Sequence, residues 1–194
     1  MSSRKIAQIG NPVLKRNNKS IRGLKTDSTK KLIKALQDTL RKNDLAGISG
    51  PQISKNYKIF LTEIRESNAQ SNQKDPLRVF INPVITYYSK TQNIIYEGCR
   101  SVVNGQLFGP VRRSNIITVE AYDENGQKYE FKCDGILART IQHEYDHLNG
   151  VLFIELVEDY SKLISEDLYK KKVKNSKKQL EAARITQKSY KLLI

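Results

Sequence analysis

The strongest constraint on the fold comes from the only two histidines in the chain, His143 and His147, which stand four residues apart. Residues four apart lie one turn above each other on a helix. Both imidazoles can therefore reach one ion, with Glu144 about 100° around the helix from His143. A zinc-like ion accepts imidazole nitrogen, and a catalytic ion keeps one coordination position for water. The spacing predicts a helix that carries a catalytic metal site.

A third protein ligand must come from elsewhere, because the chain has no third histidine. The candidates are Cys99, Cys133 and the carboxylates. Cys99 follows an apolar segment in a glycine-containing turn, which would expose its sulfur to the helix. Cys133 stands at a predicted junction between strand and helix, where a free cysteine is more often a small buried hydrophobe. The sequence favours Cys99 as the third ligand.

Periodicity and turn signals predict an α+β fold in which short antiparallel strands pack around a central metal-bearing helix. An N-terminal helix is expected at 28–43, the metal-bearing helix at 135–148 with Asp134 as its cap, and a long polar helix at 160–190. Strands are expected at 57–61, 77–81, 94–96, 116–121, 127–131 and 151–156. Two glycines and a proline argue against a regular element over 47–52, and the polar run 65–76 is typical of a loop.

Charge is spread unevenly along the chain, whose net value is +14. Residues 161–194 hold ten lysines and arginines against three acids, a net charge of +7. We therefore expect a catalytic domain over 1–160 and a basic helical extension over 161–194. The extension either meets an anionic partner or is a solvated helix face.

Composition also bounds the location of the protein. There is no long apolar segment for a membrane and no apolar core of a secretory signal, and two cysteines make no disulfide framework. We expect a cytosolic protein. The first 26 residues hold seven basic residues and no acid before Asp27, a balance also found in organellar transit peptides.

Three segments together resemble the peptide deformylase family. Residues 47–52 (GISGPQ), 97–101 (EGCRS) and 142–148 (QHEYDHL) are similar, in order and rough separation, to the family patterns GxGLAAxQ, EGCLS and QHExDHLxG. The lead-in 6–14 (IAQIGNPVL) is also similar to the family's N-terminal segment. The resemblance covers about residues 4–157, which argues against a cleaved transit peptide.

The resemblance implies hydrolysis of N-formylmethionyl peptides to formate and a free N-terminal methionine. Cys99, His143 and His147 would hold one divalent ion, often Fe²⁺ in this family, with Zn²⁺, Ni²⁺ and Co²⁺ as alternatives, and a water in the fourth position. Glu144 would move the proton of that water, as a general acid and base. The Gln52 amide and the Arg100 backbone N–H would stabilise the oxyanion, and Gly47 would leave room for the backbone of the substrate.

Other residues receive narrower expectations. Glu97 is expected to be structural, and Asp146 to accept a histidine N–H or to face solvent. Either Arg112 or Arg113 would take the role of the arginine in the family's Val-Pro-Arg run. The methionine pocket is expected to include Ile48, Leu137 and Ile141.

The chain departs from the family patterns at a few positions. Leu45 stands at the usual first glycine, Ser49-Gly50 at the usual two alanines, and Arg100 at the usual leucine. A cation beside the cleft would favour acidic residues later in the peptide.

The resemblance also bears on partners. Substrates would be nascent chains, and a C-terminal helix could dock on ribosomal RNA through its lysines, namely Lys170, Lys171, Lys172, Lys174, Lys177 and Lys178. The host would be the cytosol of a bacterium, or an organelle where synthesis also starts with formylmethionine.

Two other classes of protein fit parts of the pattern. A zinc endopeptidase also carries His-Glu-x-x-His and would take its third ligand from Glu155, Glu158 or Glu166. A non-catalytic protein would use the metal for structure and the basic segment for RNA, but structural sites normally hold four protein ligands.

Overall fold

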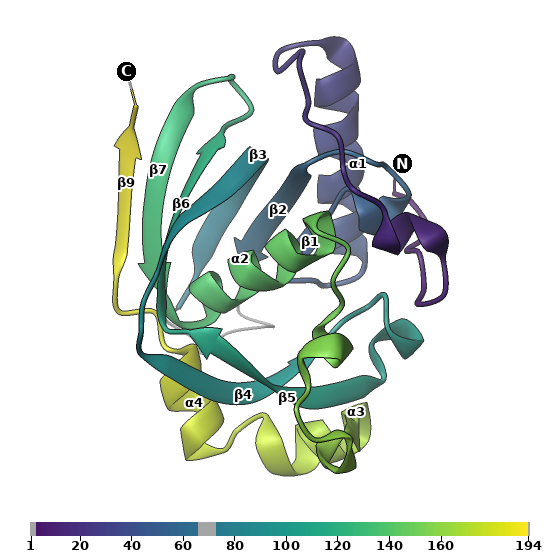
Figure 1. Ribbon diagram of the computed structural model, residues 1–194, viewed down its shortest axis with the longest axis vertical. Coiled ribbons are helices and arrows are strands. Elements are labelled where there is room, and N and C mark those ends of the chain that lie inside the picture. The colour runs from purple at the N-terminus through teal and green to yellow at the C-terminus, as the bar shows by residue number, and fades with distance from the viewer. Residues whose placement is uncertain (1–2, 66–72, 194) are drawn as a thin grey trace.

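The computed structural model describes residues 3–65 and 73–193 as a mixed α/β fold (Figure 1). The main helices are α1 (Asp27–Lys42) and α2 (Gly135–Leu148). The strands are β1 (Gly47–Ser49), β2 (Ile59–Ile64), β3 (Asp75–Tyr88), β4 (Gln92–Gly98), β5 (Leu107–Ser114), β6 (Ile116–Tyr122), β7 (Lys128–Asp134), β8 (Ile164–Ser165) and β9 (Lys188–Leu192).

All strand pairs in the two sheets are antiparallel. Six strands form one sheet in the order β1-β2-β3-β6-β7-β9, and three form a second in the order β4-β5-β8. Helix α2 lies between the two sheets and packs on strands of both (Figure 1). This position brings the histidine-bearing helix next to the turn that follows β4, where Cys99 lies.

Helix α1 begins and ends almost where the sequence predicts. The hydroxyl of Thr26 accepts the backbone N–H of Thr29 at the N-terminus, and Leu36 and Leu40 are fully buried in a cluster with β2 residues. Helix α2 also follows its prediction, with Leu137, Ile141 and Leu148 in the core beneath the six-stranded sheet. The predicted hairpin corresponds to β6 and β7.

Several predictions about the connecting segments are wrong. Residues 47–52 do hold regular structure, since Gly47–Ser49 pairs with β2 and the short 3-10 helix η2 (Pro51–Ile53) follows. Residues 151–156 are not a strand but end in the 3-10 helix η4 (Phe153–Leu156). Phe153 and the preceding Leu152 are buried in a cluster with Val111 of β5. The loop predicted at 65–76 falls mostly outside the described residues, and β3 already begins at Asp75.

The long helix predicted at 160–190, and with it the helical extension at 161–194, is also wrong. In its place the structure has η5 (Tyr160–Lys162), β8, the short helix α3 (Glu166–Leu168), the π-helical turn η6 (Tyr169–Val173), α4 (Lys177–Ala183) and β9. Long-range contacts outweigh the helical propensity of this lysine-rich stretch, because β8 pairs with β5 and β9 extends the larger sheet beside β7.

Asp134 precedes α2, but its side chain does not cap the helix as expected. Its carboxylate accepts the backbone N–H groups of Thr186 and Gln187, at 2.8 and 2.9 Å. These two donors belong to the segment that leads into β9. The carboxylate therefore fastens the C-terminal part of the chain to the start of α2.

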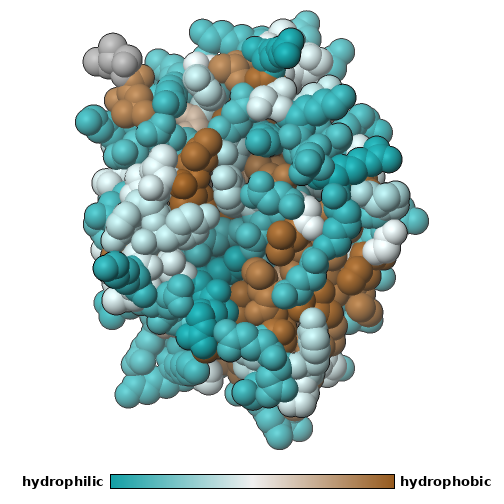
Figure 2. Space-filling view, in the orientation of Figure 1, coloured by the Kyte–Doolittle hydropathy of each residue, from teal (hydrophilic) through white to brown (hydrophobic). Residues whose placement is uncertain are grey.

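In the space-filling view most of the visible face is hydrophilic, with hydrophobic residues gathered at the lower right (Figure 2). Across the described residues, no helix combines the length and the apolar character needed to cross a bilayer.

Candidate metal centre

The thiol of Cys99 and the imidazoles of His143 and His147 meet between the two sheets. Their ligand atoms all lie within 4.8 Å of one another. Sγ of Cys99 is 3.2 Å from Nε2 of His147, and the two imidazole rings stand edge to face with centroids 5.0 Å apart. One soft thiolate and two imidazoles are a donor set that suits zinc, iron and similar divalent ions.

The electrostatics of the cluster favour the metal-binding form of the thiol. Burial by itself raises the pKa of Cys99, but the adjacent His147 and His143 hold that pKa well below its usual value. Burial likewise lowers the pKa of His143, yet Cys99 and Glu97 raise it well above the usual value. A cysteine must be a thiolate to bind a metal, so the lowered pKa of Cys99 favours its ligand form, while an ion would have to displace the proton that the raised pKa keeps on His143.

Glu97 organises the surroundings of the cluster. One of its carboxylate oxygens lies 3.0 Å from Nδ1 of His143. The same carboxylate is 2.9 and 3.0 Å from the guanidinium of Arg113 and also pairs with Arg139. Burial raises the pKa of Glu97, but Arg113 and the bond to His143 keep that pKa well below its usual value. With Nδ1 engaged by the carboxylate, Nε2 of His143 is the nitrogen available to an ion.

Glu144 stands next to the cluster as a buried carboxylate that is not fully satisfied. Only 3% of the residue is exposed, and among the described residues its Oε2 has no hydrogen-bond partner. Burial raises the pKa of Glu144, although His147 and His143 act against that rise. A buried carboxylate with an unpartnered oxygen beside such a cluster can exchange a proton with a small molecule held there.

Gln52 is oriented by Ser49. The amide oxygen of Gln52 accepts the backbone N–H of Ser49 at 2.8 Å and its hydroxyl at 3.0 Å. The amide N–H₂ group is thereby directed to the other side, where it lies 3.7 Å from Sγ of Cys99. The side chain is 2% exposed, so its donor points into the site rather than into bulk solvent.

A cleft of about 300 Å³ leads to these groups. Gly47 lies in its wall at a point where any side chain would collide, because an added Cβ would be 2.7 Å from Thr140 and 2.8 Å from Glu144. The cleft is lined by Asp44, Leu45, Ala46, Gly47, Gln52, Tyr96, Glu97, Gly98, Cys99, Arg100, Phe108, Ile136, Arg139, Thr140, His143, Glu144, Tyr169 and Gln179.

The structure brings most of the expected site residues together, but it corrects the expected pocket. Ile48, Leu137 and Ile141 do not line the cleft, since all three are fully buried in the hydrophobic core. The apolar wall on α2 is formed by Ile136, one position before Leu137. Helix α2 is packed on two sides. Adjacent residues on a helix point about 100° apart, so Leu137 faces the core while Ile136 faces the cleft.

The remaining side chains also have defined places. Asp146 is expected from the sequence to accept a histidine N–H or to face solvent. Its carboxylate pairs instead with the guanidinium of Arg113. Arg113 is thus the arginine that reaches the site, whereas Arg112 pairs with Glu158 on the surface. Cys133 is fully buried in the core, where burial raises the pKa of its thiol.

The glutamates weighed for an endopeptidase lie apart from the cluster in surface ion pairs. Glu155 pairs with Lys15, Glu158 with Arg112 and Glu166 with Lys170. Two cleft residues, Tyr169 and Gln179, were missed by the sequence analysis. They belong to a stretch whose pattern predicts a long polar helix, and no local signal marks either of them.

Comparisons with known proteins give one consistent result. A family model described as polypeptide deformylase matches residues 3–162. A peptide deformylase of Pseudothermotoga lettingae is 38% identical over 154 residues, which are 79% of this chain and 82% of the relative. A peptide deformylase of Prochlorococcus marinus is 36% identical over 175 residues, which are 88% of this chain and 84% of the relative.

The similar solved structures are also peptide deformylases. A peptide deformylase from Synechococcus elongatus in complex with actinonin has a TM-score of 0.73 and 31% identity, and the match covers 81% of this chain and 80% of that one. A class I type b peptide deformylase from Acinetobacter baumannii with bound Met-Ala-Ser has a TM-score of 0.74 and 27% identity, and the match covers 81% of this chain and 100% of that one.

Proposed function

The chain belongs to the peptide deformylase family, metal-dependent hydrolases that remove the N-terminal formyl group of nascent peptides, and from this premise we propose which of its residues perform the reaction. Cys99, His143 and His147 hold one divalent ion, for which we propose Fe²⁺, with Zn²⁺, Ni²⁺ or Co²⁺ as substitutes. The convergence of their ligand atoms within 4.8 Å supports this assignment. When bound, such an ion acts as a Lewis acid and makes water a stronger nucleophile near neutral pH.

Glu144 is the general base and then the general acid. It takes a proton from the attacking water and returns it to the nitrogen that leaves as the free amine of methionine. Its unpartnered Oε2 in a buried setting is the single observation that most supports the proposal. A positioned carboxylate of this kind contributes about 10²–10⁴ to the rate.

Gln52 and the backbone N–H of Arg100 stabilise the oxygen that becomes negatively charged as the formyl carbonyl is attacked. Donors of this kind act best when they are fixed before the reaction begins. The two bonds from Ser49 fix the Gln52 amide in this way. Gly47 lies in the cleft wall on β1, where its backbone is available to an extended peptide, and the missing side chain lets Thr140 and Glu144 pack close to that backbone.

One experiment tests these roles together. The protein is purified under anaerobic conditions, loaded in turn with iron(II), nickel or zinc, and assayed for formate release from formyl-Met-Ala-Ser. Glu144→Gln should keep its metal and lose about 10²–10⁴ of the turnover. A fully metallated Glu144→Gln protein with near-normal turnover would exclude Glu144 as the base.

Peptide preference is proposed to depend on Arg100. Its exposed guanidinium donates to the carbonyl of Asn104 at 2.6 Å and lies at the rim of the cleft. A cation in this place should favour acidic over basic residues beyond the methionine, weakly and in a salt-dependent way. Formyl peptides that differ only in Asp or Lys should differ in kcat/KM at low salt. Arg100→Leu should remove that difference, and equal values in the unaltered enzyme would exclude the role.

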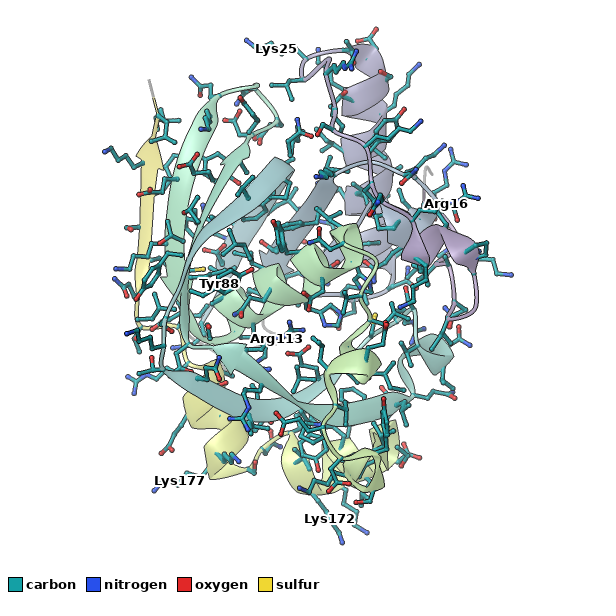
Figure 3. The ribbon with its side chains drawn as sticks, viewed as in Figure 1. Arg16, Lys25, Tyr88, Arg113, Lys172 and Lys177 are labelled. Carbon is teal, nitrogen blue, oxygen red and sulfur yellow. The ribbon has the colours of Figure 1, made fainter. Side chains whose placement is uncertain are left out.

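We propose that the catalytic domain of residues 1–160 holds the metal ligands and catalytic residues, and that the basic extension of residues 161–194 packs against it and lines part of the cleft. We propose that the lysines of the extension bind ribosomal RNA, so that the enzyme meets its nascent substrates in the cytosol of a bacterium, or in an organelle. The side chains of Lys172 and Lys177 extend away from the rest of the molecule, which supports contact with a large partner (Figure 3). Contacts of this kind release counterions and weaken steeply with salt.

A further inference from the structure

The C-terminal segment, residues 163–193, continues beyond the family match, which ends at residue 162. After β8 the segment passes along the β4–β5 sheet as α3, η6 and α4, and then rises beside β7 as β9 (Figure 1). Helix α4 packs against both β4 and α2. The segment therefore runs past the mouth of the catalytic cleft, and two of its residues, Tyr169 and Gln179, line that cleft.

Tyr169 extends the aromatic wall of the cleft. Its ring stacks on Phe108 of β5, with ring centroids 4.0 Å apart and planes inclined by 8°. The ring of Phe108 in turn covers Gly98, where an added Cβ would lie 2.7 Å from ring atoms. Gly98 directly precedes Cys99. Tyr169 is thus the outer layer of a stack whose inner layer, Phe108, covers the residue before Cys99.

Gln179 occupies the free edge of β4. Its amide oxygen accepts the N–H of Tyr96 at 3.0 Å, and its amide nitrogen donates to the carbonyl of Tyr96 at 2.9 Å. A side-chain amide in this position replaces one peptide group of a neighbouring strand. The residue is only 7% exposed, and the same nitrogen is 3.4 Å from the hydroxyl of Tyr169. The two cleft residues are therefore held together.

The position of Gln179 matters because backbone groups alternate along a strand. Tyr96 turns its N–H and C=O away from β5, so Gly98, two residues later, turns its own to the same edge. An extended peptide that lies along this edge can hydrogen-bond to Gly98, but not to the backbone of Tyr96, whose N–H and C=O are bound by Gln179. Gln179 thus marks one end of the peptide-binding edge.

We infer that Tyr169 and Gln179 are specificity-determining residues of the deformylase cleft, supplied by a segment outside the family match. Tyr169, with Phe108 and Ile136, forms the apolar wall against the side chain of the formylated residue. That side chain must enter the same cleft, because the Cα that carries it is only a few bonds from the formyl carbonyl, which is proposed to lie beside Glu144. Gln179 keeps the wall closed by tying α4 to β4. This inference rests on the proposed function.

The test compares two substrates that differ in the first residue, formyl-Met-Ala-Ser and formyl-Phe-Ala-Ser. With Tyr169→Ala the wall is opened, and the ratio of kcat/KM for the Phe peptide to that for the Met peptide should rise about tenfold, mainly through KM. Gln179→Ala should shift the ratio in the same direction. Tyr169→Phe keeps the stacked ring and should leave the ratio unchanged. Glu181→Ala, on the exposed side of α4, is the matched control.

A binding measurement provides a second readout. Titration calorimetry with the product peptides Met-Ala-Ser and Phe-Ala-Ser should show the same change in preference for Tyr169→Ala. Melting curves and metal content identify variants that fold normally, and Tyr169→Leu replaces Tyr169→Ala if the latter does not fold. An active enzyme whose preference stays constant in all folded variants would overturn the inference. Absence of formate release from the metal-loaded unaltered protein would instead contradict the proposed function.

Discussion

The carboxylate of Glu97 lies 3.0 Å from Nδ1 of His143 and is shared with the guanidinium groups of Arg113 and Arg139. All four side chains are nearly inaccessible to solvent, with 5–12% of each exposed. One buried anion therefore fixes the ring of a proposed metal ligand and pairs with two buried cations. Arg113 also pairs with Asp146 on α2, so this network joins the strands β4 and β5 to the helix that carries His143 and His147.

Glu97→Gln should weaken metal binding without removing a ligand. The amide keeps the shape of the carboxylate but loses the charge that orients His143, which typically costs about 10–100-fold in metal affinity. The change also leaves Arg139 without an anionic partner, so the free energy of unfolding should fall by about 3–5 kcal/mol. Competition with a chelator measures the affinity, and urea titration measures the stability. Glu158→Gln, which breaks the exposed pair with Arg112, should change neither by a comparable amount.

The two cysteines should respond very differently to replacement by serine. Cys99→Ser exchanges a soft thiolate for a poor hydroxyl ligand, so the purified protein should retain little metal. Cys133→Ser places a hydroxyl in the core and should lower stability while leaving the metal content unchanged. Elemental analysis of both proteins decides the matter. Normal metal content in Cys99→Ser would exclude Cys99 as a ligand and reopen the choice of a carboxylate.

The sequence predicts the candidate site well because its parts lie in short local patterns. The spacing of His143 and His147 requires only a helix, and the turn around Cys99 is marked by Gly98. The faces of α2 are harder to assign from periodicity alone. Leu137 and Ile136 differ by one position, and a helix that is buried on two sides carries apolar residues on both. The position of Leu137 beside the histidine motif predicts it in the pocket, whereas the structure has Ile136 in the cleft wall.

The C-terminal segment could not be predicted, because its structure depends on partners distant in sequence. Tyr169 is held by Phe108, Gln179 by Tyr96, and residues 186–187 by Asp134. None of these contacts can be recognised from the hydrophobic periodicity of the segment, whose lysines favour a helix. Asp134 shows the same limit, because its type and position suit a helix cap while tertiary donors engage its carboxylate.

Acid should destabilise the contact between α1 and β2 through Glu63. The hydrogen bonds from Arg41 lower the pKa of this carboxyl, although burial opposes the shift. The folded-state pKa is below that of the unfolded chain, about 4.3 for a glutamate. The pair therefore stabilises the protein above that pH, and its contribution is lost as the pH falls through the folded-state pKa. Urea titrations between about pH 6 and 3 should show a smaller loss of stability in Glu63→Gln. Parallel curves for the two proteins would exclude the pair as a source of acid sensitivity.

Ribosome binding should be tested by charge removal rather than by truncation. Truncation would delete β9 from the larger sheet and Tyr169 and Gln179 from the cleft, so it would alter stability and peptide turnover together. Replacement of the six lysines Lys170, Lys171, Lys172, Lys174, Lys177 and Lys178 by glutamine keeps the backbone intact. This variant should keep most of its turnover of formyl-Met-Ala-Ser. Its affinity for ribosomes should be lower, and the dependence of that affinity on salt should be shallower.

A second basic surface supplies the matched control. Residues 1–60 hold fourteen lysines and arginines against three acids, a larger excess than that of the C-terminal segment. Around the N-terminal end of α1, a cleft of about 550 Å³ is lined by Arg4, Arg22, Lys31 and Lys55. Replacement by glutamine of Arg22, Lys25, Lys30, Lys31, Lys55 and Lys58 removes the same charge as the C-terminal variant. Co-sedimentation at increasing salt should show the greater loss for the C-terminal variant. Equal losses would mean that net charge, rather than a docking surface on the C-terminal segment, holds the enzyme to the ribosome.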